Sequence, residues 1–305
     1  MSFKSGCLKP ALFGCLGLTV LLVVVVGVTT LMALNGVKHE QVADAELAAG
    51  QGEAVDPAQL AILASRPGRV ELDLSAGEFS IKPGEPGSGV LVKARFDRTT
   101  HKLEDRLQVL PDSSWVYRVK YHSTISGMQA LMRAIVGGNQ ESKVEVFLPP
   151  DVPIDLVVDL HQGGGEMELG GLWVRDAELN YGQGGVQLSV SEPLREPMNR
   201  LLIAGSMGGV DAKRLGNASP RYLGIDCRMG GGDIDLRGEW LNGADVGLKV
   251  RMGGISVHVP AGLSVEGAAI QGGAEGVQTG DPEVPLPILH VTIDQSMGEV
   301  ELVRR

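Results

Sequence analysis

A row of acidic and hydroxyl side chains offers the best opportunity for chemistry in this sequence. Four residues hold equivalent positions, each shortly after a repeated glycine motif: Asp211, Asp235, Ser256 and Glu301. Carboxylates on one face of neighbouring strands can act as a general acid and a general base. No base in a special context accompanies the row. We therefore predict no catalytic residue, and a carbohydrate-active β-helix enzyme remains a less favoured alternative.

Metal and cofactor ligands are not grouped in the sequence. The six histidines lie without the spacing of metal ligands, at His39, His101, His122, His161, His258 and His290. The run from Gly230 to Asp235 departs from a calcium-binding nonapeptide, because an aspartate takes a required glycine position and the repeat is longer. We expect no metal and no cofactor.

The glycine motif recurs through the second half of the chain. Its methionine falls at Met207, Met229, Met252 and Met297, which are 22, 23 and 45 residues apart. Gln162 and Gln183 hold the same place in two earlier copies, and Gln271 near the middle of the long gap indicates a degenerate copy. A period near 22 residues, with a strand on each side of the glycines, is typical of a solenoid.

The glycines of this motif are expected to form the corners of stacked coils. A positive φ is unstrained only without a Cβ atom, and glycine also permits close approach of neighbouring backbones. The predicted corner glycines are Gly164, Gly185, Gly208, Gly209, Gly230, Gly231, Gly253, Gly254 and Gly298. An aliphatic ladder should follow them, made of Val210, Ile234, Ile255 and Val300. We expect the methionines to form a second core ladder, since thioether-only metal sites are uncommon.

The local patterns outside the motif predict strands and one helix. Apolar and polar residues alternate from Arg69 onward, as in half-buried strands. Cys227 is expected to be a small buried hydrophobe. One helical face is formed by Met128, Leu131, Met132, Ile135 and Val136. This helix, within residues 127–138, is expected to cap the sheet or, alternatively, to present an interaction face to a partner.

The N-terminus carries a candidate membrane anchor. Residues 11–34 are uncharged and mostly apolar, long enough for a helix to cross a hydrocarbon core of ~30 Å. A cleaved secretory signal is the alternative, but its apolar region would be shorter. Lys4 and Lys9 precede the span and predict a cytoplasmic N-terminus. The expected organisation is a cytoplasmic segment 1–10, a transmembrane helix 11–34, a linker 35–68 and an extracytoplasmic domain 69–305.

The composition excludes several other classes of protein. The 305 residues include 43 glycines without the strict triplet of collagen. Three cysteines are too few for a disulfide scaffold, and the abundance of aliphatic residues argues against disorder. A net charge of -10 disfavours nucleic-acid binding. Few aromatics and many glycines instead favour short strands joined by tight turns.

Two segments carry a resemblance to a known family. The segment Gly163-Gly164-Gly165-Glu166-Met167 and the segment Gln183-Gly184-Gly185-Val186 resemble the toastrack domain of LiaF-like envelope-stress proteins and related adhesin-like solenoids. The resemblance extends over residues 69–305. It implies an all-β fold, a right-handed single-stranded β-solenoid, with no enzymatic activity and a bacterial source.

These observations lead to one functional hypothesis and its competitors. We expect a single-pass protein of the bacterial cell membrane that acts by binding an envelope protein or a second copy of itself. Some relatives restrain a membrane histidine kinase that reports envelope damage, so stress sensing or regulation is the implied role. Those relatives usually have several membrane spans, whereas this chain has one. A passive structural or adhesin-like protein is the closest alternative.

Overall fold

The computed structural model describes residues 42–48, 66–125, 142–267 and 287–304. The described strands belong to one compact unit that spans Val42–Thr124 and Glu141–Arg305. Within these residues, none of the helical structure has the length and apolar character needed to cross a bilayer. The expected transmembrane helix at 11–34 and the expected amphipathic helix at 127–138 lie outside the described residues.

The chain folds as an all-β structure with one short 3-10 helix, η1 (Leu215–Ala218), in its described part. The N-terminal strands are β1 (Val42–Ala48), β2 (Gly68–Leu74), β3 (Glu78–Pro83), β4 (Leu91–Asp97), β5 (His101–Val109), β6 (Trp115–Ser123) and β7 (Lys143–Leu148). The remaining strands are β8 (Ile154–Gln162), β9 (Gly164–Glu168), β10 (Val174–Ser189), β11 (Arg200–Lys213), β12 (Tyr222–Asp235), β13 (Ala244–Val259), β14 (Ser264–Glu266) and β15 (Ile288–Arg304).

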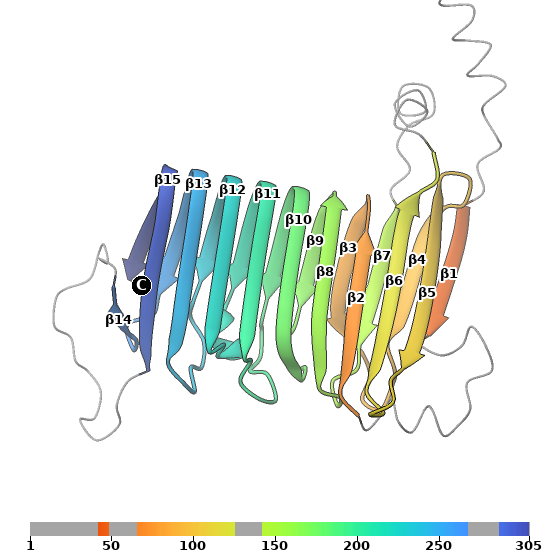
Figure 1. Cartoon of the computed structure of the whole chain (residues 1–305), viewed down its shortest axis with the longest axis horizontal. Coiled ribbons are helices and arrows are strands. Elements are labelled where there is room, and N and C mark those ends of the chain that lie inside the picture. Colours follow the sequence, from red (N-terminus) through yellow and green to blue (C-terminus); the bar gives the residue numbers. More distant parts are fainter. Residues whose placement is uncertain (1–41, 49–65, 126–141, 268–286, 305) are drawn as a thin grey trace, which may run out of the picture. The chain divides into compact units, whose positions relative to one another are not determined.

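The C-terminal half is the predicted β-solenoid. Strands β10, β11, β12, β13 and β15 stack in parallel, and each bends once so that it contributes to two layers (Figure 1). The methionines Met207, Met229, Met252 and Met297 pair in register across the last four of these strands. Loops return the chain from the end of one layer to the start of the next. The 22-residue period is therefore the length of one coil.

The prediction of a degenerate coil between Met252 and Met297 is wrong. β13 and β15 pair directly along their length, so no coil lies between them. β14 instead pairs with the first residues of β15 on its other side. Gln271, on which that expectation rested, lies outside the described residues. A doubled sequence spacing is therefore a longer connection and not a missing turn of the solenoid.

The N-terminal half does not stack in chain order. β2 and β3 form a coil that lies between the β6–β7 coil and the β8–β9 coil. β4 and β5 then run antiparallel to β7 and β6. β1 pairs antiparallel with β4, within the segment that the sequence assigned to a linker. Such long-range pairings leave no periodic signal in the sequence.

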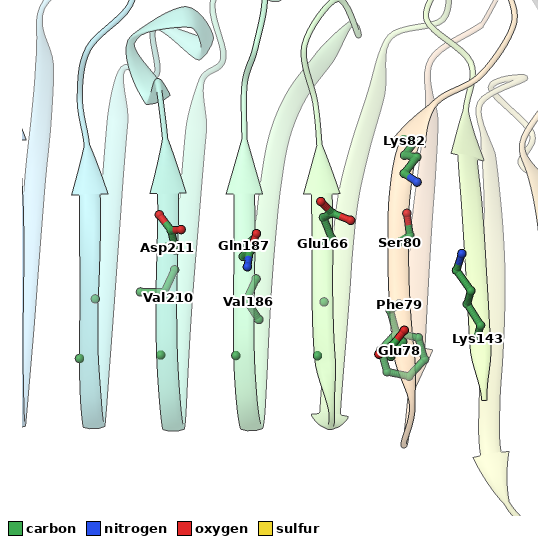
Figure 2. Close-up of a pocket in the computed structure, with 16 residues that line it drawn as sticks. Glu78, Phe79, Ser80, Lys82, Lys143, Glu166, Val186, Gln187, Val210 and Asp211 are labelled. Carbon is green, nitrogen blue, oxygen red and sulfur yellow. The ribbon is translucent and has the colours of Figure 1, made fainter. Parts of the chain in front are cut away.

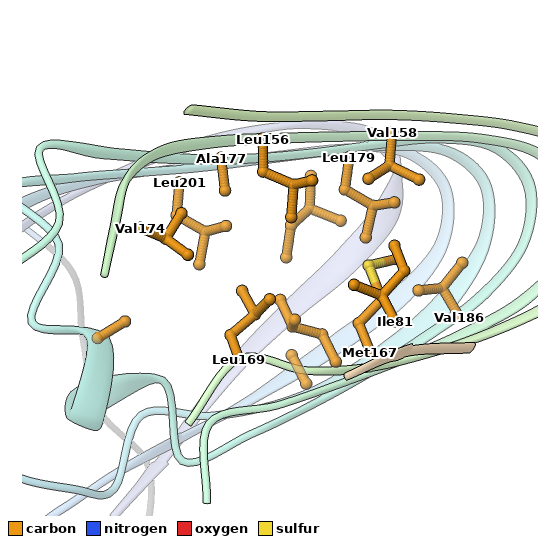
Figure 3. Packing of buried hydrophobic residues seen from close by; sticks show 14 of the residues in the cluster. Ile81, Leu156, Val158, Met167, Leu169, Val174, Ala177, Leu179, Val186 and Leu201 are labelled. Atoms are coloured by element: carbon orange, nitrogen blue, oxygen red, sulfur yellow. The ribbon is translucent and has the colours of Figure 1, made fainter. Parts of the chain in front are cut away.

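The core lies between the two layers. Figure 3 shows Leu156, Val158 and Leu179 of one layer facing Met167 and Val186 of the other. These side chains alternate with outward polar residues, and strand stacking aligns them into aliphatic ladders. Burying each large aliphatic side chain contributes about 1.5–3 kcal/mol, which makes this shared core the main source of stability.

One member of the expected aliphatic ladder is placed differently. Val210 pairs with Gly232, and Gly232 pairs with Ile255, whereas Ile234 pairs with Val257. The register follows the Met-Gly-Gly backbone, and Gly232 of β12 takes the ladder position. A Cβ atom on Gly232 would lie 2.7 Å from Val210 Cγ1, so the valine fills the space.

Candidate functional site

The corner of each regular coil is a single glycine with a positive φ. This corner column consists of Gly163, Gly184, Gly208, Gly230 and Gly253, with φ between 114° and 132°. In the first two of these coils the corner falls one residue before the predicted Gly164 and Gly185. Gly298 continues the register next to Gly253, but its φ is not positive.

Close backbone stacking explains the corner column. A Cβ atom on Gly184 would collide with the carbonyl oxygen of Gly163, and one on Gly208 would collide with that of Gly184. The same collision occurs between Gly230 and Gly208, and again between Gly253 and Gly230. Both the backbone conformation and the neighbouring coil therefore exclude a side chain here.

A second column of glycines follows the corners and has a different environment. It consists of Gly164, Gly185, Gly209, Gly231 and Gly254, all of them predicted corner residues, and none has a positive φ. A Cβ atom on Gly185 would meet no atom within 4 Å. At Gly164, Gly209 and Gly254 the nearest atom would be 3.7–3.9 Å away, and only at Gly231 is it close, at 2.8 Å. We call this column the glycine trough.

A groove on the described surface is lined by four glycines of the trough, Gly164, Gly185, Gly209 and Gly231. The groove has a volume of about 790 Å³ and crosses β3, β9, β10, β11 and β12. Figure 2 shows Ser80, Glu166, Gln187 and Asp211 along it, one residue on each of four adjacent strands. The sequence pointed to Asp211 but not to the other three. Ser80 could not be found because β3 joins the stack out of chain order, whereas Glu166 and Gln187 follow earlier copies of the glycine motif at the same position and could have been found.

Ser80 is an unusual member of the groove. Its side chain is in the outward row of β3 between Phe79 and Ile81, yet the residue is only 5% exposed. Its Oγ atom has no hydrogen-bond partner. A buried hydroxyl without a partner costs about 1–3 kcal/mol, and so it marks a place where a ligand group would be favourable.

The row of acidic and hydroxyl residues that the structure forms differs in one member from the row expected from the sequence. Asp211 pairs in register with Asp233, which pairs with Ser256 and then with Glu301. Asp235 lies two residues farther along, beside His258. β12 has no inserted residue, since Gly232 stands where the neighbouring coils have Val210 and Ile255. The expected equivalence of Asp235 with this row is therefore wrong.

The carboxylates of this region have their own basic partners. Lys213 Nζ lies 2.9 Å from Asp211, and His258 Nε2 lies 2.8 Å from Asp233. Asp235 is 6% exposed and accepts hydrogen bonds from the Arg237 guanidinium and backbone N–H. Burial acts to raise the pKa of Asp235, but the hydrogen bonds from Arg237 outweigh it and hold the pKa below its usual value. Paired carboxylates of this kind stabilise the coil edge.

The methionine column lies on the outside of the protein, and the expectation that it packs in the core is wrong. Met207, Met229, Met252 and Met297 are 39%, 41%, 40% and 77% exposed. At the corner the strict alternation breaks: Cys227 points inward, and both Arg228 and Met229 are exposed. We call these four in-register side chains the methionine ladder. Exposed arginines, Arg228 and Arg251, precede two of them.

The buried thiol agrees with its prediction. Cys227 is 2% exposed, and its Sγ atom lies 3.6 Å from the Tyr181 hydroxyl. Burial raises the pKa of the Cys227 thiol, which keeps the thiol protonated and unreactive. Tyr181 reaches it by lying over Gly205 of the intervening strand, where a Cβ atom would collide with the tyrosine ring.

Comparisons with known proteins agree with the fold. The model of the N-terminal domain of toast_rack matches residues 51–205. A structure of a candidate cell adhesion protein from Clostridium sporogenes is 13% identical, with a TM-score of 0.40, and the match covers 87% of this chain and 100% of that one.

Two candidate adhesins from Parabacteroides are more distant. The Parabacteroides merdae protein is 8% identical with a TM-score of 0.24, covering 87% of this chain and 96% of that one. The Parabacteroides distasonis protein is 11% identical with a TM-score of 0.21, covering 87% and 98%. Likeness at this level carries no information on function. No curated protein matches the chain.

Proposed function

The chain belongs to the family of the N-terminal toast_rack domain, and from this premise we propose that it is a non-enzymatic binding protein of the bacterial cell envelope. In this proposal, residues 11–34 anchor it in the membrane as a single span, and the β-solenoid lies on the extracytoplasmic side. It acts by binding a protein partner, in the sensing or regulation of cell-envelope stress.

The methionine ladder is the observation that carries this proposal. Four large apolar side chains line up on the outside of successive coils, where each adds apolar area to one continuous surface. A continuous apolar patch exposed to water marks an interaction site more often than scattered apolar residues do. Methionine is also common at binding surfaces, because its flexible and polarisable side chain adapts to different partners.

The surroundings of the ladder define the partner's chemistry. Arg228 and Arg251 are exposed and immediately precede Met229 and Met252. A partner that buries the thioethers must also satisfy these two guanidinium groups. We therefore expect an apolar segment that carries Asp or Glu side chains, since arginine pairs with carboxylates in two parallel hydrogen bonds.

The test is a double substitution, Met229→Ser together with Met252→Ser, in the full-length chain. Both side chains are solvent-exposed, so the fold should tolerate serine. Loss of two central apolar contacts should reduce crosslinked partner recovered from native membranes by about tenfold or more. The measurement is quantitative mass spectrometry of the crosslinked material.

The matched control is Leu241→Ser. Leu241 is 62% exposed and lies outside the ladder, so this substitution removes an exposed apolar side chain elsewhere. It should leave the recovery of the partner unchanged. Equal recovery from the double variant and the wild type would contradict the proposal, and the absence of any stoichiometric partner would favour a passive structural or adhesin-like protein.

A further inference from the structure

The glycine trough is a surface from which the sequence has removed side chains on five successive strands. Gly185, Gly209, Gly231 and Gly254 pair in register, and Gly164 lies beside Gly185 on the neighbouring strand. The next strands on the two sides carry Glu78 and Glu299 at the same position. With strands ~4.8 Å apart, the trough runs about 19 Å from Gly164 to Gly254, and the two flanking glutamates stand about 29 Å apart.

The fold itself does not require most of these glycines. Unlike the corner column, the trough has no positive φ, and at four of its five positions a Cβ atom would have ordinary or no contacts. Glycine within a strand also lowers stability relative to residues with side chains. Space that could be filled without strain is therefore kept open at the same position of coil after coil.

Ser80 is an independent sign of a ligand at this place. It lines the groove, is only 5% exposed, and its Oγ atom has no hydrogen-bond partner. The hydroxyl stands in the same outward row as Glu166, Gln187 and Asp211 (Figure 2). Each strand thus contributes one polar group: a hydroxyl, two carboxylates and one amide. This row forms a polar wall along the open floor.

The chemistry of the wall selects the class of ligand. Glu166 and Asp211 repel polyanions, and the lysines that reach the groove, Lys82 and Lys143, lie 3.9 and 3.0 Å from Glu145. Carboxylates and amides in a row are suited to hydrogen-bond many hydroxyl groups. An open floor of bare peptide accepts a flat ring, which a floor with side chains would not.

The spacing of the wall selects a polysaccharide over a peptide. The ligand lies across the strands, so its repeat must match the strand spacing of ~4.8 Å. An extended peptide advances ~3.3 Å per residue and falls out of step within two strands. A β-1,4-linked pyranose chain advances by close to one strand spacing per sugar, and each sugar can then meet one wall residue.

We propose that the glycine trough binds a neutral β-1,4-linked polysaccharide strand, with one hexopyranose unit on each coil. The Ser80 hydroxyl donates to a sugar oxygen at one end, and Glu166, Gln187 and Asp211 bind hydroxyl or amide groups along the strand. This site uses other residues than the methionine ladder, because the wall lies two residues after the trough glycines and the methionines lie two residues before them, as Met207, Gly209 and Asp211 show on β11.

The experiment is calorimetric titration of the full-length chain in detergent. The probes are two β-1,4-linked hexamers, of N-acetylglucosamine and of glucose, which distinguish amide from hydroxyl recognition. The α-1,4-linked glucose hexamer and a polyuronate serve as controls of linkage and charge. At least one β-1,4 hexamer should bind, and neither control should.

Two variants place the ligand in the trough. Gly185→Thr fills open space with a good strand residue and should weaken binding by about tenfold or more. Ser80→Ala adds no bulk and should weaken binding about threefold to tenfold through the loss of one hydrogen bond. The matched control is Gly89→Thr, at an equally open glycine outside the groove, which should bind as the wild type does.

Three results would overturn the proposal. They are no binding of either β-1,4 hexamer, equal binding of the α-1,4 hexamer, or unchanged affinity in both Gly185→Thr and Ser80→Ala. None of these results bears on the proposed protein-binding function, because that function is tested by the Met229→Ser and Met252→Ser double variant.

Discussion

Replacing Gly184 by alanine is expected to lower the free energy of unfolding by about 2–6 kcal/mol. Gly184 has a φ of 128°, a region that costs a residue with a Cβ atom about 1–3 kcal/mol. The added methyl group would also collide with the carbonyl oxygen of Gly163, and overpacking adds about 1–3 kcal/mol. Urea unfolding of the full-length chain, followed by circular dichroism, measures the change.

The adjacent residue is the control for this prediction. Gly185 has no positive φ, and a Cβ atom there would meet nothing within 4 Å. Gly185→Ala should therefore be neutral or stabilise the protein by about 0.4–1 kcal/mol, through a smaller entropy of the unfolded chain. Equal effects of the two substitutions would show that the corner is not at Gly184.

The second large effect concerns the inward face of the corner. Gly205 lies in the core between Tyr181 and Cys227, and the tyrosine ring occupies the space above it. Gly205→Leu should destabilise the protein by about 3 kcal/mol, because the leucine displaces the ring and breaks the Tyr181–Cys227 contact. The same unfolding measurement reports this loss.

A double-mutant cycle identifies the cause. Tyr181→Ala alone should cost about 3–5 kcal/mol, since it leaves a cavity. Combined with Gly205→Leu, the leucine fills part of that cavity, and the double variant should be about 1–3 kcal/mol more stable than the two single losses predict. Gly205→Leu combined with Leu289→Ala, on a strand three coils away, should be additive. Additivity in the first pair would contradict the packing described.

The repeat could be predicted from the sequence because one physical requirement recurs in each coil. A positive φ under a stacked carbonyl demands glycine, so the corner column has a readable period. The strands on each side alternate and bury one face, which also leaves a pattern. Stacking in register then follows, as the pairing of Met207 with Met229 illustrates.

The remaining features depend on contacts that local patterns do not encode. The bend at each corner turns both Arg228 and Met229 outward, so alternation alone placed the methionines wrongly in the core. Gly232 of β12 replaces the aliphatic residue of the ladder, so an alignment by residue type placed Ile234 and Asp235 two residues out of register. The order of the N-terminal coils depends on long-range pairing, and this order brings Ser80 beside Glu166.

The two candidate surfaces have a common origin in this architecture. In stacked coils, residues at equivalent outward positions lie side by side. Methionine at one such position in successive coils forms the methionine ladder, and glycine at another forms the glycine trough. Substituting one outward residue in a single coil would interrupt either surface without disturbing the core. Binding surfaces of this kind can therefore change while the fold is retained.

Methionine oxidation in native membranes is the most direct test of the claim that this protein acts by binding through its ladder. In the purified chain, hydrogen peroxide should oxidise the four ladder methionines at least about tenfold faster than Met167 and Met198, which are 3% and 0% exposed. In native membranes the bound partner should slow oxidation of the ladder towards the rate of these buried residues. Equally fast oxidation of the ladder in both preparations, measured by mass spectrometry, would contradict the account.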